Sequence, residues 1–95
     1  MYAIVLDLNF EILKNHFEDP HKIAFDEISH ELNKFAFEKT TGNIFIHRLE
    51  KDGLKDLYRA INRLSTIPWL KDSIRELRAF KIEDWSNFTS IIKES

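Results

Sequence analysis

The chain has 95 residues and a formal net charge of −2, with 14 Lys and Arg against 16 Asp and Glu. This length predicts a single domain, residues 1–95, and domains this small are often completed by a second copy. The absence of Cys excludes disulfides, thiolate zinc sites and a Cys nucleophile. Nucleic-acid binders usually carry a basic surface, so any phosphate contact must come from a local cluster.

The first segment is an apolar run that predicts a buried strand over residues 2–9, interrupted by Asp7. Because an unpaired charge in a strand is costly, we expect Asp7 to be paired, protonated, metal-bound or at a solvent-facing interface. The structural alternative is a buried acid bonded to backbone amides or paired with a basic residue. Asp7 is therefore a candidate site residue.

The chain opens directly with this strand, and no apolar run approaches the roughly 20 residues that cross a bilayer. We therefore expect no leader peptide, no membrane partner and a cytoplasmic protein.

Helix signals follow the first strand. Residues 11–14 could form a short helical turn, and Asp19-Pro20 is typical of a helix start, because Asp caps free amides and Pro is tolerated at the first position. An amphipathic helix is predicted after it, with a core face formed by Ala24, Ile28, Leu32 and Phe35.

Two β-rich segments, residues 35–40 and 44–48, surround Gly42 and predict a hairpin. We expect residues 51–53 to end the hairpin and cap a second helix. Its apolar stripe is predicted from helical spacing, and Asp56 is predicted to face outward. The stripe consists of Leu54, Leu57, Tyr58, Ile61 and Leu64.

Pro68 is predicted to end or kink the second helix. For residues 73–83 a strand with a bulge is favoured, and a continuous helix is the competing interpretation. Ser86 is predicted to cap a short last helix. The element order indicates an α+β fold, the ferredoxin-like βαββαβ sandwich with a short C-terminal helix. The uncovered face of the sheet would be wet, covered by the last helix or buried in a dimer.

Three segments resemble the virulence-associated protein D (VapD) family, and the similarity extends over essentially the whole chain. They are residues 1–8, the stretch Ala60-Ile61-Asn62 followed by Trp69, and residues 73–89, which include Glu83-Asp84-Trp85-Ser86-Asn87-Phe88-Thr89. The resemblance implies a ferredoxin-like homodimer. It also implies an endoribonuclease acting on RNA as the toxin of a toxin–antitoxin pair, similar in structure to the small nuclease-like subunit of CRISPR adaptation complexes. The family's proposed catalytic carboxylate corresponds to Asp7.

The family hairpin usually reads Gly-Phe, a few residues, then Thr-Gln-Gly-Ser-aliphatic-Tyr. Phe37, Thr40 and Gly42 match this pattern, whereas Ala36, Thr41, Asn43 and Phe45 depart from it. The hairpin Ser is a candidate site residue in the family. Asn43 stands in its place and keeps a donor and an acceptor, but it is bulkier and cannot act as an alkoxide.

This departure leaves two main hypotheses open. One is an active endoribonuclease toxin with a cognate antitoxin protein. The other is a catalytically weak or inactive module of the same fold that binds RNA or protein. A regulatory domain that binds a small molecule at a dimer interface is a third, for which the sequence offers no Gly-rich loop.

The candidate site residues follow from the resemblance and from the chemistry of RNA cleavage. Asp7, Thr40 and Asn43 are the catalytic candidates, although residues 40–43 are most simply a turn. The RNA-binding candidates are Lys39, Gly42 and Arg48, while the other basic residues are expected to form a solvated surface.

Asp7 is also the candidate metal ligand. Two Asp7 carboxylates meeting across a two-fold axis could hold a divalent cation such as Mg²⁺, or their mutual repulsion could make one of them a stronger base. The four His residues show no helical pair spacing typical of zinc sites. His47 is the best acid–base candidate among them because it follows the hairpin.

Overall fold

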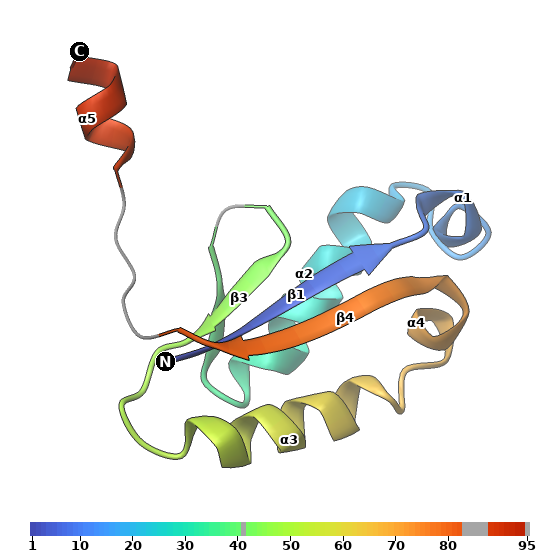
Figure 1. Ribbon diagram of the computed structural model, residues 1–95. Helices are drawn as coiled ribbons and strands as arrows, with labels where there is room; N and C mark the ends of the chain where they lie inside the picture. Colours follow the sequence, from blue (N-terminus) through green and yellow to red (C-terminus); the bar gives the residue numbers. More distant parts are fainter. Residues whose placement is uncertain (41, 83–87, 95) are drawn as a thin grey trace.

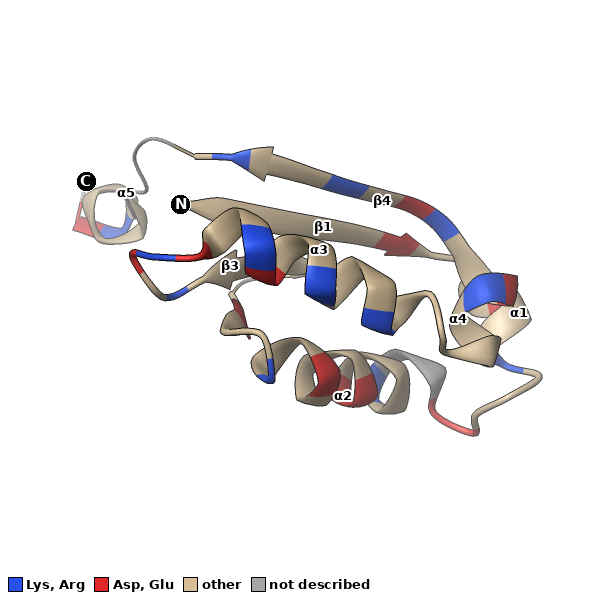
Figure 2. Ribbon diagram, turned by 90° about the horizontal axis from the view of Figure 1, so that it is seen from below, with Lys and Arg blue, Asp and Glu red and all other residues tan. Residues whose placement is uncertain are grey.

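The computed structural model describes residues 1–40, 42–82 and 88–94. Within these residues, the strands form an antiparallel sheet in the order β2-β3-β1-β4, and α2 and α3 lie together on one of its faces (Figures 1 and 2). The elements in chain order are β1 (Tyr2–Leu8), α1 (Phe10–Leu13), α2 (Pro20–Asn33), β2 (Phe37–Lys39), β3 (Ile44–His47), α3 (Gly53–Leu64), α4 (Pro68–Ser73), β4 (Ile74–Lys81) and α5 (Thr89–Glu94). The fold is the expected ferredoxin-like α+β sandwich with a short C-terminal helix.

Strand β1 lies between β3 and β4 and sends alternate side chains to the two faces of the sheet. Ile4, Leu6 and Leu8 are buried in the core against the helices. Asp7 shares the opposite face with Ala3 and Val5. We call that side the open face; cross-strand pairing adds Ile44, Ile46, Glu76, Arg78 and Phe80 to it.

Helix α2 begins where the sequence predicts. Asp19 is the N-cap, and its side chain accepts a hydrogen bond of 3.4 Å from the Lys22 amide. The core-facing side chains Ala24, Ile28 and Leu32 are buried, as helical spacing predicts. Phe35, the fourth predicted member of this face, lies in the turn beyond the end of α2 and is partly buried.

Helix α3 differs from its prediction in two respects. Asp52 occupies the N-cap position with φ of 62°, but its side chain makes no capping hydrogen bond. The predicted apolar stripe is wrong at Leu54 and Tyr58, which are 48% and 63% exposed, while Ala60 is buried. The two side chains project about 60° and 100° around the helix axis from the buried Leu57, beyond the narrow arc that faces the sheet.

Pro68 has a second role that the sequence interpretation missed. Helix α3 ends at Leu64, and Pro68 then starts the new short helix α4. Ile67 is extended, with φ of −88° and ψ of 111°, as expected for a residue before proline.

Strand β4 confirms the predicted strand with a bulge. Asp7 pairs with Glu76 and Leu8 pairs with Ile74, so Arg75 is an extra residue on β4. The bulge returns Ile74 and Leu77 to the same side, where both pack against the core.

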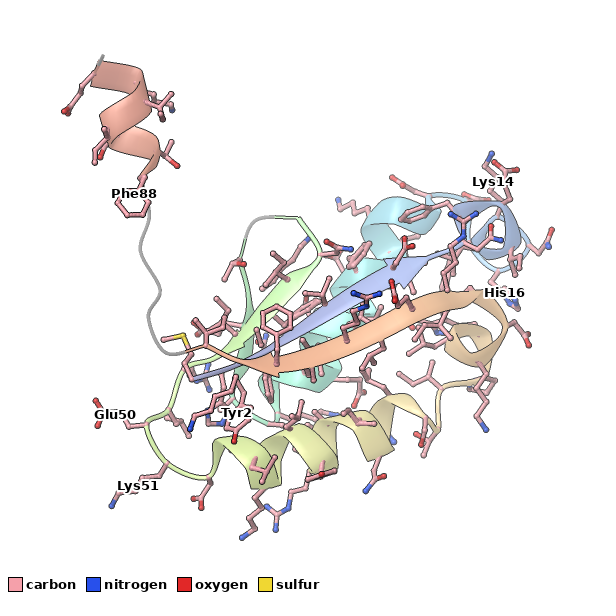
Figure 3. All side chains as sticks on the ribbon, in the orientation of Figure 1. Tyr2, Lys14, His16, Glu50, Lys51 and Phe88 are labelled. Carbon is pink, nitrogen blue, oxygen red and sulfur yellow. The ribbon has the colours of Figure 1, made fainter. Side chains whose placement is uncertain are left out.

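Helix α5 stands apart from the sheet and does not cover its open face (Figure 1). Phe88, just before it, lies far from the sheet in Figure 3 and is 63% exposed, and Ile91 and Ile92 are 59% and 75% exposed. The predicted cap Ser86 lies outside the described residues. No described helix combines the length and the apolar character needed to cross a membrane.

Candidate active site

A cavity lies where the hairpin turn meets the end of β1. Strand β1 continues to Leu8, but its register with β3 ends at Val5 and Ile44. A cavity of about 600 Å³ forms beyond this point, and we call it the Asp7 cavity. Its lining contains five of the six residues predicted from the sequence: Asp7, Lys39, Thr40, Gly42 and Asn43.

Asp7 presents a free carboxylate to this cavity. The residue is exposed, and its carboxylate makes no hydrogen bond or ion pair with any other residue that the structure describes. The alternative of a buried acid paired with a basic side chain is therefore wrong. Of the expectations for Asp7, the solvent-facing position is the one observed in the single chain.

Thr40 and Asn43 tie the turn to the sheet. The Thr40 hydroxyl donates to the Ile44 carbonyl oxygen at 3.1 Å. The Asn43 side-chain amide donates to the Leu6 carbonyl oxygen, and the Leu6 amide donates to the Asn43 carbonyl oxygen at 3.2 Å. Each side chain donates a hydrogen bond to the main chain, so both hold the turn beside Asp7 and retain oxygen atoms as acceptors.

Among the described residues that line this cavity, Lys39 is the one basic residue. Its ammonium nitrogen lies 5.0 Å from the centroid of the Phe25 ring, a cation–π distance. This contact holds a positive charge at the cavity that contains the Asp7 carboxylate.

Gly42 and Arg48 have different surroundings. Gly42 has φ of 70°, a left-handed conformation that favours glycine, although an added Cβ would meet no atom within 4 Å. The turn geometry, rather than space, therefore favours Gly42. Arg48 is outside the cavity lining, and its guanidinium donates to Glu38 at 2.9 Å.

Two aromatic residues of the cavity were missed as site residues. Phe10 and Phe25 both line the cavity, with ring centroids 6.3 Å apart, and neither is among the site residues that the sequence predicts. The available signal was an aromatic residue three positions after the candidate carboxylate, at the point where the first strand ends.

His47 is a buried structural residue outside the Asp7 cavity. It is 2% exposed, and its Nε2 lies 2.8 Å from the Asp56 carboxylate. The prediction that Asp56 faces outward is therefore wrong, because this contact turns its side chain toward β3. Among the described residues, no group of three or more His, Asp or Glu is placed to hold a metal ion.

A second cavity, of about 640 Å³, lies between α2 and the α3–α4 region. Its described lining includes Asp26, Glu27 and Glu31. The basic side chains among these described lining residues are His30 and Arg63, and Arg63 is already bonded to Glu31. Figure 2 shows the acidic residues along α2 and the basic residues along α3. This excess of negative charge disfavours a polyanion, so the Asp7 cavity is the better candidate site.

No model of a known protein family matches the chain. It is 44% identical over 93 residues to "Endoribonuclease VapD" of Helicobacter pylori, covering 98% of this chain and 99% of the relative. It is 46% identical to the protein of the same name from Dichelobacter nodosus, covering 98% of each chain. It is 39% identical to "Endoribonuclease VapD" of Haemophilus influenzae, covering 98% of this chain and 99% of that one. The chain therefore belongs to the VapD endoribonuclease family.

Proposed function

We propose that this protein is an endoribonuclease that cleaves RNA in the Asp7 cavity. One observation carries the proposal: an exposed carboxylate, free of partners among the described residues, shares a cavity with the basic side chain of Lys39. The sequence relatives named as endoribonucleases support the same class of reaction.

Asp7 acts as the general base. Its carboxylate takes the proton from a ribose 2′-hydroxyl, and the oxygen attacks the adjacent phosphorus. Lys39 stabilises the negative charge that develops on the phosphate oxygens. The bond from phosphorus to the 5′-oxygen then breaks, and that oxygen takes a proton from water. The products are a 2′,3′-cyclic phosphate and a free 5′-hydroxyl.

Thr40 and Asn43 position these groups. Their hydrogen bonds to Ile44 and Leu6 fix the turn, and with it Gly42, beside the carboxylate. Arg48 lies outside the cavity and would contact only a more distant part of the RNA.

A divalent cation such as Mg²⁺ fits the donor set of the cavity, because Asp7, Thr40 and Asn43 all offer oxygen atoms. Asp7 would hold such an ion together with water and phosphate oxygens. A bound cation would add charge stabilisation at the phosphate.

The active form is proposed to be a homodimer. The open face carries apolar side chains, among them Phe80, which is 45% exposed, and Asp7 lies on the same face. Pairing of two open faces would cover this apolar surface and bring the two Asp7 carboxylates nearer to each other. The proposed role is that of a cytoplasmic toxin whose cleavage is stopped by a cognate antitoxin protein.

The test is cleavage of a labelled RNA by the wild type, by Asp7→Asn and by Glu76→Gln. Glu76 is the matched control, since it is an exposed carboxylate directly across the sheet from Asp7. We expect Asp7→Asn to lower the rate by about 100-fold or more, as loss of a general base does, and Glu76→Gln to change it little. Full cleavage by a folded Asp7→Asn protein would contradict the proposal.

Two further arms of this experiment examine the cation and the antitoxin. Wild-type cleavage is expected to continue in EDTA, because Asp7 and Lys39 supply the base and the positive charge. If EDTA stops cleavage and added Mg²⁺ restores it, the charge stabilisation comes from a cation at Asp7 instead. The toxin–antitoxin pairing predicts that a small protein is encoded beside this gene and that it stops cleavage when added in equal amount. Failure of such a protein to stop cleavage would contradict the pairing.

The inactive binding module is the second candidate, favoured by the structural hydrogen bond of Asn43 to Leu6. It predicts that the wild type binds RNA without cleaving it and that Asn43→Ser gains cleavage. Cleavage by the wild type would exclude it.

A further inference from the structure

We infer that the Asp7 cavity contains a nucleobase subsite, in which the ring of Phe10 stacks on the base next to the cleaved bond while Lys39 holds the phosphate. The inference rests on the proposed function and adds to it the part of the nucleotide that the cavity recognises.

The backbone around Phe10 is fixed beside Asp7. Phe10 is the first residue of α1, and the N-cap side chain of Asn9 accepts hydrogen bonds from the Glu11 amide at 3.1 Å and the Ile12 amide at 3.3 Å. The Asn9 amide donates to the Ser73 carbonyl oxygen at 2.7 Å. These bonds fix the backbone at the start of α1 directly after β1, and Phe10 lines the cavity from this position.

The two rings of the cavity are suited to different parts of a nucleotide. Phe25 is 7% exposed and carries the Lys39 ammonium at 5.0 Å from its centroid. Phe10 is only partly buried and offers the more accessible ring, tilted by 42° from Phe25. Phe25 therefore positions the cation, and Phe10 provides the surface on which a base can lie.

The chemistry of the lining matches one nucleotide. The cavity pairs an aromatic surface with a positive charge, as a base and its phosphate require, and places the proposed catalytic carboxylate nearby. Stacking needs no particular hydrogen-bond pattern, because every base has a π-face. Leu6 and Leu8 add apolar side chains to the lining beside the two aromatic rings.

The test compares Phe10→Leu and Phe10→Tyr on two RNA oligonucleotides. The cleaved bond is first mapped on a normal oligonucleotide. The second oligonucleotide has the same sequence but carries an abasic ribonucleotide next to that bond. We expect Phe10→Leu to raise KM for the normal oligonucleotide by about tenfold, within the range of base–aromatic stacking, and to change KM for the abasic one little. Phe10→Tyr keeps a ring and is expected to restore wild-type KM.

Two controls separate stacking from folding and from chemistry. Thermal unfolding checks that Phe10→Leu is folded, and Tyr58→Leu, which removes an exposed ring outside the cavity, is expected to leave KM unchanged. Binding of a fluorescent 2′-deoxy version, measured by anisotropy, tests the subsite without cleavage. An equal effect of Phe10→Leu on the normal and abasic oligonucleotides would overturn the subsite alone. If the wild type does not cleave RNA but Phe10→Leu still weakens binding of the 2′-deoxy oligonucleotide, only the proposed nuclease activity is overturned.

Discussion

Asp7 and Glu31 are carboxylates in opposite surroundings. Asp7 is exposed and makes no ion pair with another described residue. Glu31 receives hydrogen bonds from the Arg63 guanidinium at 2.7 and 3.3 Å and an ion pair from Lys34 at 3.3 Å. The Arg63 hydrogen bonds, with help from Lys34, hold the pKa of Glu31 at about 2 instead of 4.5. The Glu31 carboxylate therefore links α2 to α3 through Arg63, whereas the Asp7 carboxylate can contact a substrate.

The lowered pKa of Glu31 predicts a pH dependence of stability. The contribution of the pair is fully present above the unfolded pKa of 4.5 and is lost as the pH falls toward the folded pKa of about 2. We expect this contribution to be small, because Arg63 is half exposed and solvent screens the pair. Urea unfolding of wild type and Arg63→Gln at pH 5 and pH 2.5 should show a difference that shrinks at the lower pH.

The matched control for this prediction is Arg59→Gln. Arg59 is an exposed residue of the same helix and forms no ion pair with a described carboxylate. A difference between wild type and Arg63→Gln that stays constant from pH 5 to pH 2.5 would show that Glu31 does not supply the stabilisation.

At the scale of elements, the connection from β3 to α3 is fixed by buried contacts. The His47 ring has an acceptor at each nitrogen, with the Leu49 carbonyl oxygen 3.0 Å from Nδ1 and the Asp56 carboxylate 2.8 Å from Nε2. Gly53 lies against Tyr2, which Figure 3 shows close to the start of α3, and an added Cβ would come within 2.6 Å of the Tyr2 ring. The connection therefore needs a carboxylate at Asp56 and no side chain at Gly53.

Removal of the acceptor should destabilise this connection. We expect Asp56→Ala to lower the free energy of unfolding by about 1–3 kcal/mol, because a buried imidazole N–H is left without an acceptor. Urea unfolding measures the change, and Glu50→Ala, an exposed acid of the same connection, is expected to change it by less than about 0.5 kcal/mol. Equal effects of the two substitutions would contradict the role of the His47–Asp56 contact.

At the scale of the whole molecule, one face of the sheet is left without a covering layer of helices. The helices cover one face of the sheet, whereas the open face and α5 carry exposed apolar side chains, including Phe80 and Ile92. Such surfaces usually mark contacts with other chains. A second copy of this chain is the proposed occupant, since pairing of two open faces would also bring the two Asp7 carboxylates nearer to each other.

The proposed dimer predicts a mass of about twice the 11.3 kDa of the chain in light scattering. Phe80→Lys should produce the monomer, because it places a charge in the apolar contact. Tyr58→Lys is the matched control, since Tyr58 is an exposed aromatic residue on the helical side of the molecule. A wild-type monomer, or a dimer unaffected by Phe80→Lys, would contradict an interface on the open face.

Local sequence patterns predicted the strands, helices α2 and α3 and the central residue of the candidate site, whereas the short helix α4 was missed. Asp19-Pro20 marked the start of α2, the slip in apolar phase marked the bulge of β4, and an acid within an apolar strand marked Asp7. These signals are local, because caps, turns and periodicity depend on residues a few positions apart. The fold class followed from the order of the elements, to which the resemblance added family and function.

Which residues share the cavity depends on contacts between distant segments of the chain. Phe10 and Phe25 join Asp7 there, whereas Arg48 is paired with Glu38 outside it. The inward position of Asp56 also depends on a contact with another element, His47. Contacts between segments distant in the sequence depend on how the helices and the hairpin pack on β1, and no local pattern of residue types encodes that packing.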